Sequence, residues 1–115
     1  MAKYISEHER KWKTDDIVGN KMELCELWND GNVSARLVRM PKGKDLGFHR
    51  HETWVQVFVL SGKLRVTPGE KVVEKGGYYF VEPGDEHGEM SEEEALVLVI
   101  RDEPNRQYPI SEKTV

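Results

Sequence analysis

Short apolar segments separated by glycine and proline turns constrain the fold of this chain more than any other feature. These segments are residues 54–60, 63–67, 71–74, 78–81 and 94–100. They are rich in β-branched and aromatic residues, which favour strands. Pro68-Gly69 and Gly76-Gly77 stand between segments, and such dipeptides mark turns. Because no stretch shows an amphipathic helix of useful length, the pattern predicts an all-β barrel or sandwich.

The chain divides into a central strand-rich region and two polar ends. Residues 1–20 are polar, and we interpret them as an N-terminal arm or short strand that packs on a partner subunit. Residues 21–103 hold the strand segments and are expected to form one barrel domain. Residues 104–115, with prolines at positions 104 and 109, are interpreted as a C-terminal tail.

Composition excludes several classes of protein. The net charge is −4 and no basic stripe appears, which argues against a nucleic-acid partner. The apolar run at residues 95–100 is far shorter than the roughly 20 residues of a membrane helix. Cys25 is the single cysteine, so no intramolecular disulfide forms and a reducing compartment is expected. Residues 1–16 are charged throughout and lack the apolar stretch of a signal peptide, so none is expected. A cytoplasmic protein is predicted.

Turn chemistry predicts two hairpins. Asn29-Asp-Gly-Asn32 separates the segments at residues 21–28 and 33–40, and its residue types suit a tight turn. Ser61-Gly62 separates the segments at residues 54–60 and 63–67 in the same way. Each pair of flanking segments is therefore expected to form two antiparallel strands joined by a tight turn.

Toward the end of the chain, residues 87–90 are expected to form a short piece, separate from a closing strand at residues 94–100.

The aromatic residues of the strand segments alternate as in a barrel core. Most are expected to be packed inside, with one or two lining a cavity. They are Trp54, Phe58, Tyr78, Tyr79 and Phe80.

Three histidines predict a metal site. His49 and His51 alternate along an extended segment, so their side chains share one face. Their imidazoles would lie close enough to hold one ion. His87 follows the turn at residues 82–86, far along the chain. An isolated His-x-His pair is more often exposed than metal-bound, but a third histidine near the end of a second strand-rich block favours a site.

The segments around these histidines resemble the cupin superfamily, and in particular its small single-domain conserved barrels. The first cupin motif places a glycine before His-x-His and another glycine after it; the second places two glycines before a histidine. The matching residues are Gly43, His49, His51 and Gly62 in the first motif and Gly76, Gly84 and His87 in the second. Glu82 stands where the second motif usually has proline. The resemblance implies a double-stranded β-helix, the jelly-roll cupin barrel, and a bound divalent metal ion.

The glutamate that usually completes the cupin ligand set is missing. Counting back from Gly62 places Val55 there, whereas counting on from the second histidine places Gln56 there. With Val55 inward, three neutral imidazoles would hold the ion, which favours a chelating anion as ligand. With Gln56 inward, its amide would be a weak ligand or a polar group of the pocket. Glu89, two residues beyond the third histidine, is either a restored carboxylate ligand or a solvated residue.

Three strand arginines, Arg36, Arg39 and Arg65, are further candidates for the pocket. An arginine that points into a barrel is costly unless an acid or an anionic ligand pairs with it. An inward arginine would therefore be informative about the ligand.

The resemblance implies a function as well as a fold. Cupins with three-histidine sites include oxygen-using iron enzymes, so we expect a metal-binding cupin that acts on a small oxygen-rich or anionic metabolite, as a dioxygenase, isomerase or decarboxylase. The alternative is a non-catalytic cupin module that senses a small molecule or a metal. Imidazole ligands leave Fe, Mn, Ni, Zn and Cu open as the metal. Small barrels of this family commonly pair, which predicts a homodimer.

Overall fold

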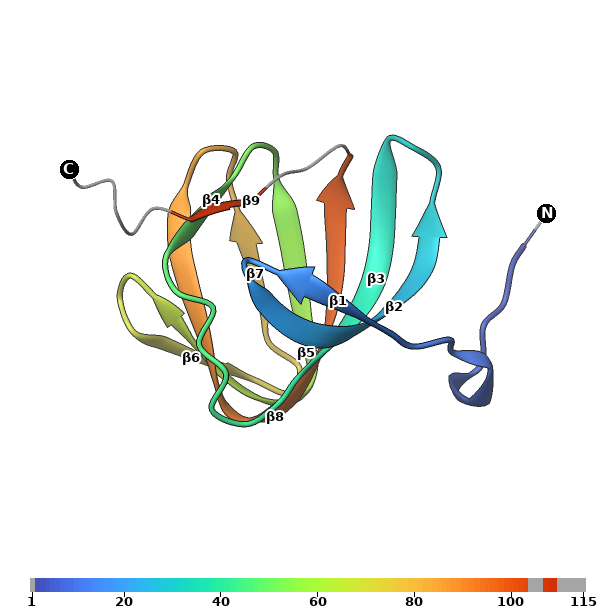
Figure 1. The fold of residues 1–115 in the computed structure, drawn as a ribbon, viewed down its shortest axis with the longest axis horizontal. Coiled ribbons are helices and arrows are strands. Elements are labelled where there is room, and N and C mark those ends of the chain that lie inside the picture. Colours follow the sequence, from blue (N-terminus) through green and yellow to red (C-terminus); the bar gives the residue numbers. More distant parts are fainter. Residues whose placement is uncertain (1, 104–106, 110–115) are drawn as a thin grey trace.

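The structure is a computed structural model that describes residues 2–103 and 107–109 (Figure 1). A short 3-10 turn, η1 (Glu7–Glu9), precedes a chain of strands. The strands are β1 (Lys13–Ile17), β2 (Asn20–Asn29), β3 (Val33–Met40), β4 (His49–His51), β5 (Val55–Thr67), β6 (Lys71–Glu74), β7 (Tyr78–Val81), β8 (Glu86–Asp102) and β9 (Gln107–Pro109). The predicted all-β jelly-roll architecture is confirmed. No helix in the described residues has the length and apolar character needed to cross a membrane.

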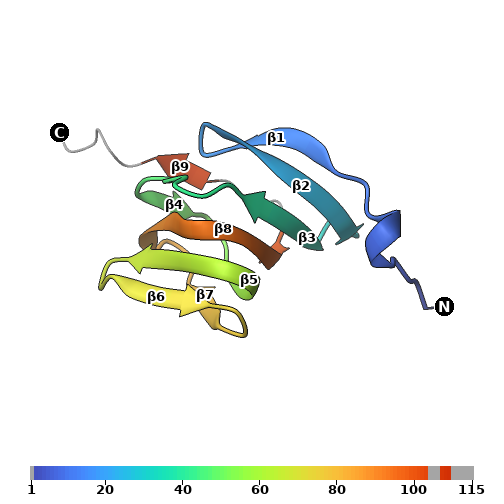
Figure 2. The same ribbon diagram turned by 90° about the horizontal axis from the view of Figure 1, so that it is seen from below.

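Strands β5 and β8 form the centre of the sheet. They pair antiparallel over nearly their whole length, from Val55 opposite Arg101 to Thr67 opposite Gly88. On its other side β5 pairs with β7 and β6, and β8 continues through β3 and β2 to β1. Figure 2 shows β3, β8 and β5 stacked in this order, with β6 and β7 beyond β5. The beginning of β8 also pairs with β4, which carries β9 along its other edge.

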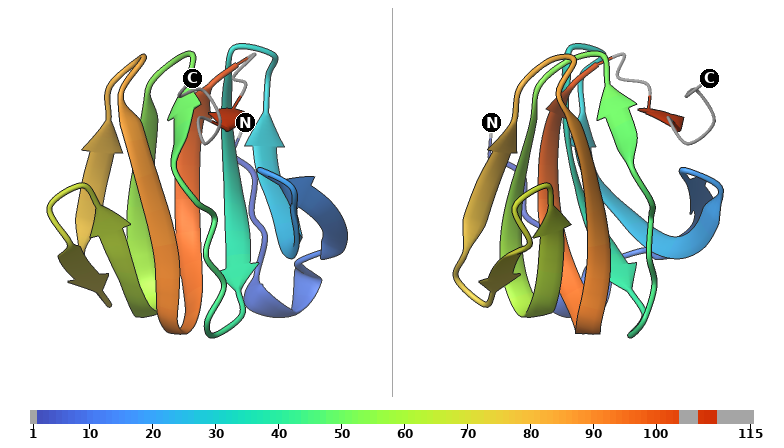
Figure 3. Two further views of the ribbon diagram at one scale, coloured as in Figure 1. Left: turned by 60° about the vertical axis from the view of Figure 1, so that its left-hand side comes forward. Right: turned by 90° about the vertical axis from the view of Figure 1, so that its left-hand side faces the viewer.

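These pairings fold the sheet over a shared interior. In the right view of Figure 3, β5, β6 and β7 lie on one side, and β4, β9 and the curved β2 lie on the other. The interior is filled by one cluster of buried aliphatic residues drawn from both sides, including Leu24, Val38, Val57, Leu64 and Val97. This core fixes the relative positions of β4 and β8, which carry the histidines.

The hairpin formed by β2 and β3 is confirmed. The Asn29 Oδ1 accepts a 2.8 Å hydrogen bond from the N–H of Gly31, and the Asp30 Oδ1 accepts one of 2.9 Å from the N–H of Val33. These side chains satisfy the turn's backbone donors, which is why Asn and Asp suit it.

The two polar ends both contribute strands. Within the residues 1–20 interpreted as an arm, β1 pairs with β2, from Lys13 opposite Leu24 to Ile17 opposite Asn20. Within the residues 104–115 interpreted as a tail, β9 pairs with β4; the remainder of that segment lies outside the described residues. The predicted homodimer stays a prediction.

The second predicted hairpin is wrong, because Ser61-Gly62 is not a turn. The chain continues through it as one strand, β5. Its register against β8 shifts between Val59 and Ser61 and again before Lys63. Gly62 has φ +85°, and a Cβ there would lie 2.6 Å from the Cα of Ala95. The glycine therefore forms a bulge that bends β5, a role in which a positive φ and a close backbone approach both exclude side chains.

Two smaller expectations also fail. Residues 87–90 and 94–100 are not separate pieces, because β8 runs unbroken through both. The aromatic residues of β7 are also less buried than expected, because most of them do not pack inside. Tyr78 and Phe80 are 46% and 48% exposed, whereas Tyr79 packs against the core and Val81 lies within it. Side chains alternate along a strand, so one shift in phase exchanges the two faces.

Candidate metal centre

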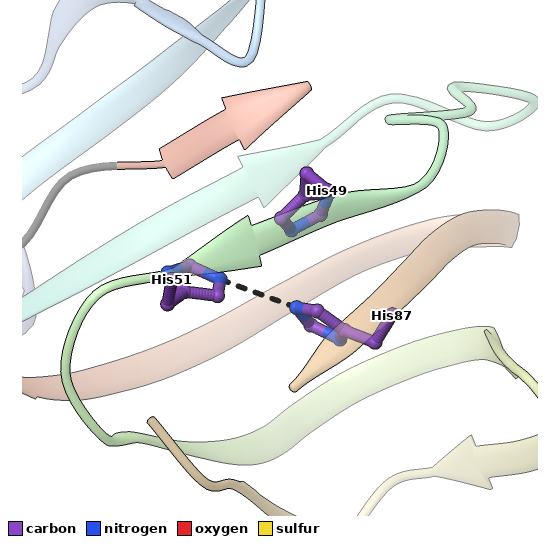
Figure 4. A group of neighbouring side chains, drawn as sticks. All are labelled: His49, His51 and His87. Atoms are coloured by element: carbon purple, nitrogen blue, oxygen red, sulfur yellow. Dashed lines mark hydrogen bonds between the residues drawn. The ribbon is translucent and has the colours of Figure 1, made fainter. Parts of the chain in front are cut away.

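Strand pairing brings the three histidines together. His49 and His51 are the two ends of the short strand β4 and point to the same side. The register places His49 directly opposite His87 on β8, so these side chains also share a face. All three are buried, with exposures of 1%, 5% and 5% for His49, His51 and His87. Figure 4 shows their rings converging on one point between the two strands.

The distances between the rings suit a shared ion. The Nε2 atoms of His51 and His87 are 3.2 Å apart (Figure 4), and one ring nitrogen from each histidine lies within 4.8 Å of the others. Metal–nitrogen bonds of about 2.0–2.1 Å in tetrahedral geometry separate two ligand nitrogens by roughly 3.3 Å. The donor set and spacing therefore fit a divalent metal held by three imidazoles.

A backbone contact fixes which nitrogen of His49 is free. The Nδ1 of His49 lies 3.0 Å from the carbonyl oxygen of Gly47. A carbonyl only accepts hydrogen bonds, so Nδ1–H donates and the unprotonated Nε2 points to the other rings. Metal-ligating histidines are commonly oriented in this way. The Nδ1 atoms of His51 and His87 have no partner among the described residues.

Burial favours the neutral form of His51 and His87, which is the form that metal ligation requires. The pKa of His51 is lowered to about 3, mainly by burial and further by the neighbouring His49 and His87. The pKa of His87 is also lowered, again mainly by burial. Protons therefore compete weakly with a metal for these nitrogens near neutral pH.

The metal-free protein is expected to lose stability on acidification. The unfolded chain protonates His51 near its ordinary pKa of 6.5, whereas the folded chain does so only at about 3. Acid thus favours the unfolded state, and the free energy of unfolding should fall by about 2 kcal/mol between pH 7 and pH 5 from this residue. Urea unfolding of wild type and His51→Gln measures the difference. The exposed His8 is the control, because His8→Gln should retain the full pH dependence; a flat wild-type profile would contradict the account.

The structure places Val55, and not Gln56, at the missing glutamate position. Val55 is buried and lines the pocket beside the histidines. Gln56 lies on the opposite face, where its Oε1 accepts a 2.9 Å hydrogen bond from the hydroxyl of Tyr78. The inward Gln56 weighed above is therefore wrong, because β5 begins at Val55 and alternates from there.

Glu89 faces the pocket and is not a solvated residue. Its Oε1 lies 3.8 Å from the Nε2 of His49, and its side chain is only 11% exposed. The hydroxyl of Tyr79 donates a hydrogen bond to Oε2, and burial, with the adjacent Glu89, raises the pKa of Tyr79 well above its ordinary value. Tyr79 therefore stays a proton donor that holds the carboxylate toward the histidines. The sequence suggested Glu89 but gave no sign of this pairing.

The histidines lie in a pocket with aliphatic walls. The cavity between them is small, about 40 Å³, and its lining also contains Glu89 and Arg36. The other two strand arginines have partners elsewhere. Arg39 pairs with Glu23 at 2.8 Å, and Arg65 donates through Nε to Glu92 at 2.7 Å.

The features that define a cupin are a jelly-roll barrel and two motifs that bring histidines to one interior point. This chain has both features. A family model described as the ChrR cupin-like domain matches residues 2–105, and the chain therefore belongs to that family. No curated protein matches the sequence.

Solved structures share this fold at low sequence identity. An RmlC-like cupin from Shewanella frigidimarina is 20% identical, with a TM-score of 0.72, over 99% of this chain and 97% of that chain. A predicted oxalate decarboxylase from Thermotoga maritima is 15% identical, with a TM-score of 0.73, over 87% and 98%. The structure of Rhodobacter sphaeroides SigE with the anti-sigma ChrR matches at 22% identity and a TM-score of 0.70, over 84% of this chain and 52% of the matched chain.

Proposed function

We propose that this protein is a metal-dependent cupin enzyme that acts on a small oxygen-rich or anionic metabolite. His49, His51 and His87 would hold one divalent ion, with Glu89 as a further ligand or as a hydrogen-bonding group beside it. The observation that carries the proposal is the convergence of three buried imidazole nitrogens within 4.8 Å at one pocket. A structural role alone does not account for three neutral imidazoles facing each other in an apolar interior.

The chemistry follows from the ligand set. A bound divalent ion supplies Lewis acidity or activates dioxygen at the positions that the protein leaves open. With Val55 in place of the usual glutamate, three imidazoles contribute no negative charge, which favours an anionic or chelating ligand. Glu89, held by Tyr79, is placed to accept or return a proton beside the ion. The aliphatic walls limit the water around the reacting atoms.

A second candidate function is sensing without turnover. It is favoured by the family itself, because the ChrR cupin-like domain is named after an anti-sigma protein, and a structure containing ChrR bound to SigE shares the fold. In that case the same pocket would bind a metal or a small molecule and report its presence to a protein partner.

Turnover separates the two candidates. Protein loaded with Fe²⁺ or Mn²⁺ is assayed for oxygen consumption with β-dicarbonyl and thiol substrates and for carbon dioxide release from oxalate. The enzyme proposal expects turnover that falls at least about tenfold in Glu89→Gln, because the proton acceptor is lost. Gln56→Ala, a change on the opposite face of β5, is the matched control and should retain activity. Metal binding without turnover of any substrate would favour the sensing module.

A further inference from the structure

Arg36 is a cation inside the pocket that the metal site does not use. On β3 the pocket-facing side chains alternate, and they are Arg36, Val38 and Met40. Its Cα lies opposite Val99 of β8, another pocket residue. Arg36 thus shares the pocket with the three histidines and is surrounded mainly by aliphatic side chains.

Arg36 lacks the partner that a buried arginine normally has. Its Nε is buried and without a hydrogen-bond acceptor among the described residues, and none of the ion pairs formed there includes it. Burial, more than any neighbouring charge, lowers the pKa of Arg36 to about 10. The half-buried side chain therefore still carries its positive charge at neutral pH, and no ion pair among the described residues compensates it.

The charged groups that face Arg36 do not neutralise it. Glu26, opposite it on β2, and Asp15 on β1 act on it only at a distance. The nearby acid Glu103 is engaged by Arg101, whose Nε donates to its Oε2 at 3.0 Å, and by Ser34, whose hydroxyl donates at 2.6 Å. The repulsion from Arg101 adds to the cost of burial. The described residues thus leave the charge of Arg36 without an ion-pair partner in the pocket.

We propose that Arg36 is a specificity-determining residue that binds the carboxylate of a short acid, with an apolar carbon chain and one further oxygen, in the histidine pocket. A carboxylate matches the planar donor fork of arginine with paired, charge-assisted hydrogen bonds. The aliphatic lining accepts the carbon chain of such an acid, while its remaining oxygen faces the imidazoles. This inference rests on the proposed function for the position of the ligand, and it narrows the metabolite from oxygen-rich molecules in general to carboxylates.

Two probes of nearly equal shape test the inference. The probe 2-oxobutanoate carries a carboxylate where 2-oxobutanamide carries an uncharged carboxamide. Isothermal titration calorimetry measures the binding of each to the metal-free and the Zn²⁺-loaded protein, for wild type, Arg36→Met and Arg36→Lys. Arg39→Met is the matched control, because it removes the same charge from the same strand at a position that pairs with Glu23 outside the pocket. Thermal unfolding confirms that each variant is folded.

The expected result is selectivity for the acid that depends on Arg36. Wild type should bind 2-oxobutanoate at least tenfold more tightly than 2-oxobutanamide, and Arg36→Met should lose roughly tenfold or more of that preference. Arg36→Lys, with the charge but without the fork, should lie between them, and Arg39→Met should match wild type. Equal selectivity in wild type and Arg36→Met, or binding of neither probe, overturns the inference.

The outcome also separates this inference from the proposed function. If Zn²⁺ binds but Arg36→Met leaves the selectivity unchanged, the metal site stands and the role of Arg36 fails. If the protein holds no metal and still prefers the acid through Arg36, the carboxylate site stands and the metal-dependent function fails.

Discussion

Replacing His51 with alanine is expected to lower metal affinity by at least about 100-fold. Loss of an outer-shell partner alone commonly costs 10–100-fold, and His51 would be a direct ligand. Its Nε2 lies 3.2 Å from that of His87, so its removal opens one side of the site. Competition with a chromophoric chelator measures the affinity, and elemental analysis of protein purified without a histidine tag measures the metal content.

The control for this prediction is the histidine outside the pocket. His8 lies in the exposed 3-10 turn η1, and His8→Ala should retain full metal content and affinity. Unchanged affinity in His51→Ala, with one ion still bound per chain, would show that the ligands lie elsewhere and that the convergence of the three rings serves another purpose.

Gly62→Ala is expected to destabilise the fold by more than about 3 kcal/mol. The new methyl group would force a non-glycine residue into a positive φ, at a cost of about 1–3 kcal/mol. It would also meet the backbone of Glu94 and Ala95 on β8, where rigid main-chain atoms cannot turn aside. Overpacking of this kind adds about 1–3 kcal/mol. Chemical denaturation of the metal-free protein measures the change.

Gly31→Ala separates the two contributions. Gly31 has φ +90°, but a Cβ there would meet nothing within 4 Å. Gly31→Ala should therefore carry only the conformational cost. It should destabilise the fold by at least about 1 kcal/mol less than Gly62→Ala does. Equal effects at both positions would mean that β8 does not press against the bulge, and that β5 is not bent as described.

The convergence of the three histidines could be predicted from sequence because their placement depends on local rules. The alternation of a strand puts His49 and His51 on one face, and the turn at residues 82–86 leads directly to His87 at the end of the second motif. The glutamate position could not be settled in the same way. The sequence of the segment between β4 and β5 does not determine which residues of β5 face the interior. A shift of one residue there would turn Gln56 inward in place of Val55.

The remaining errors have a common physical origin in long-range pairing. Ser61-Gly62 has the composition of a turn and also of a bulge, and only the approach of Ala95 on β8 distinguishes them. The contact between Tyr79 and Glu89 joins two strands, so neither residue alone indicates it. Sequence marked three arginines as informative, but the phase of β3 decided that Arg36 is the one in the pocket.

X-ray absorption spectroscopy of the Zn²⁺-loaded protein tests the central claim most directly. Three imidazole rings from His49, His51 and His87 should appear as three nitrogen neighbours at about 2.0–2.1 Å with the outer-shell scattering of histidine. His87→Ala should reduce the number of rings to two. A zinc environment with no histidine scattering, or one that is identical in His87→Ala, would contradict the account.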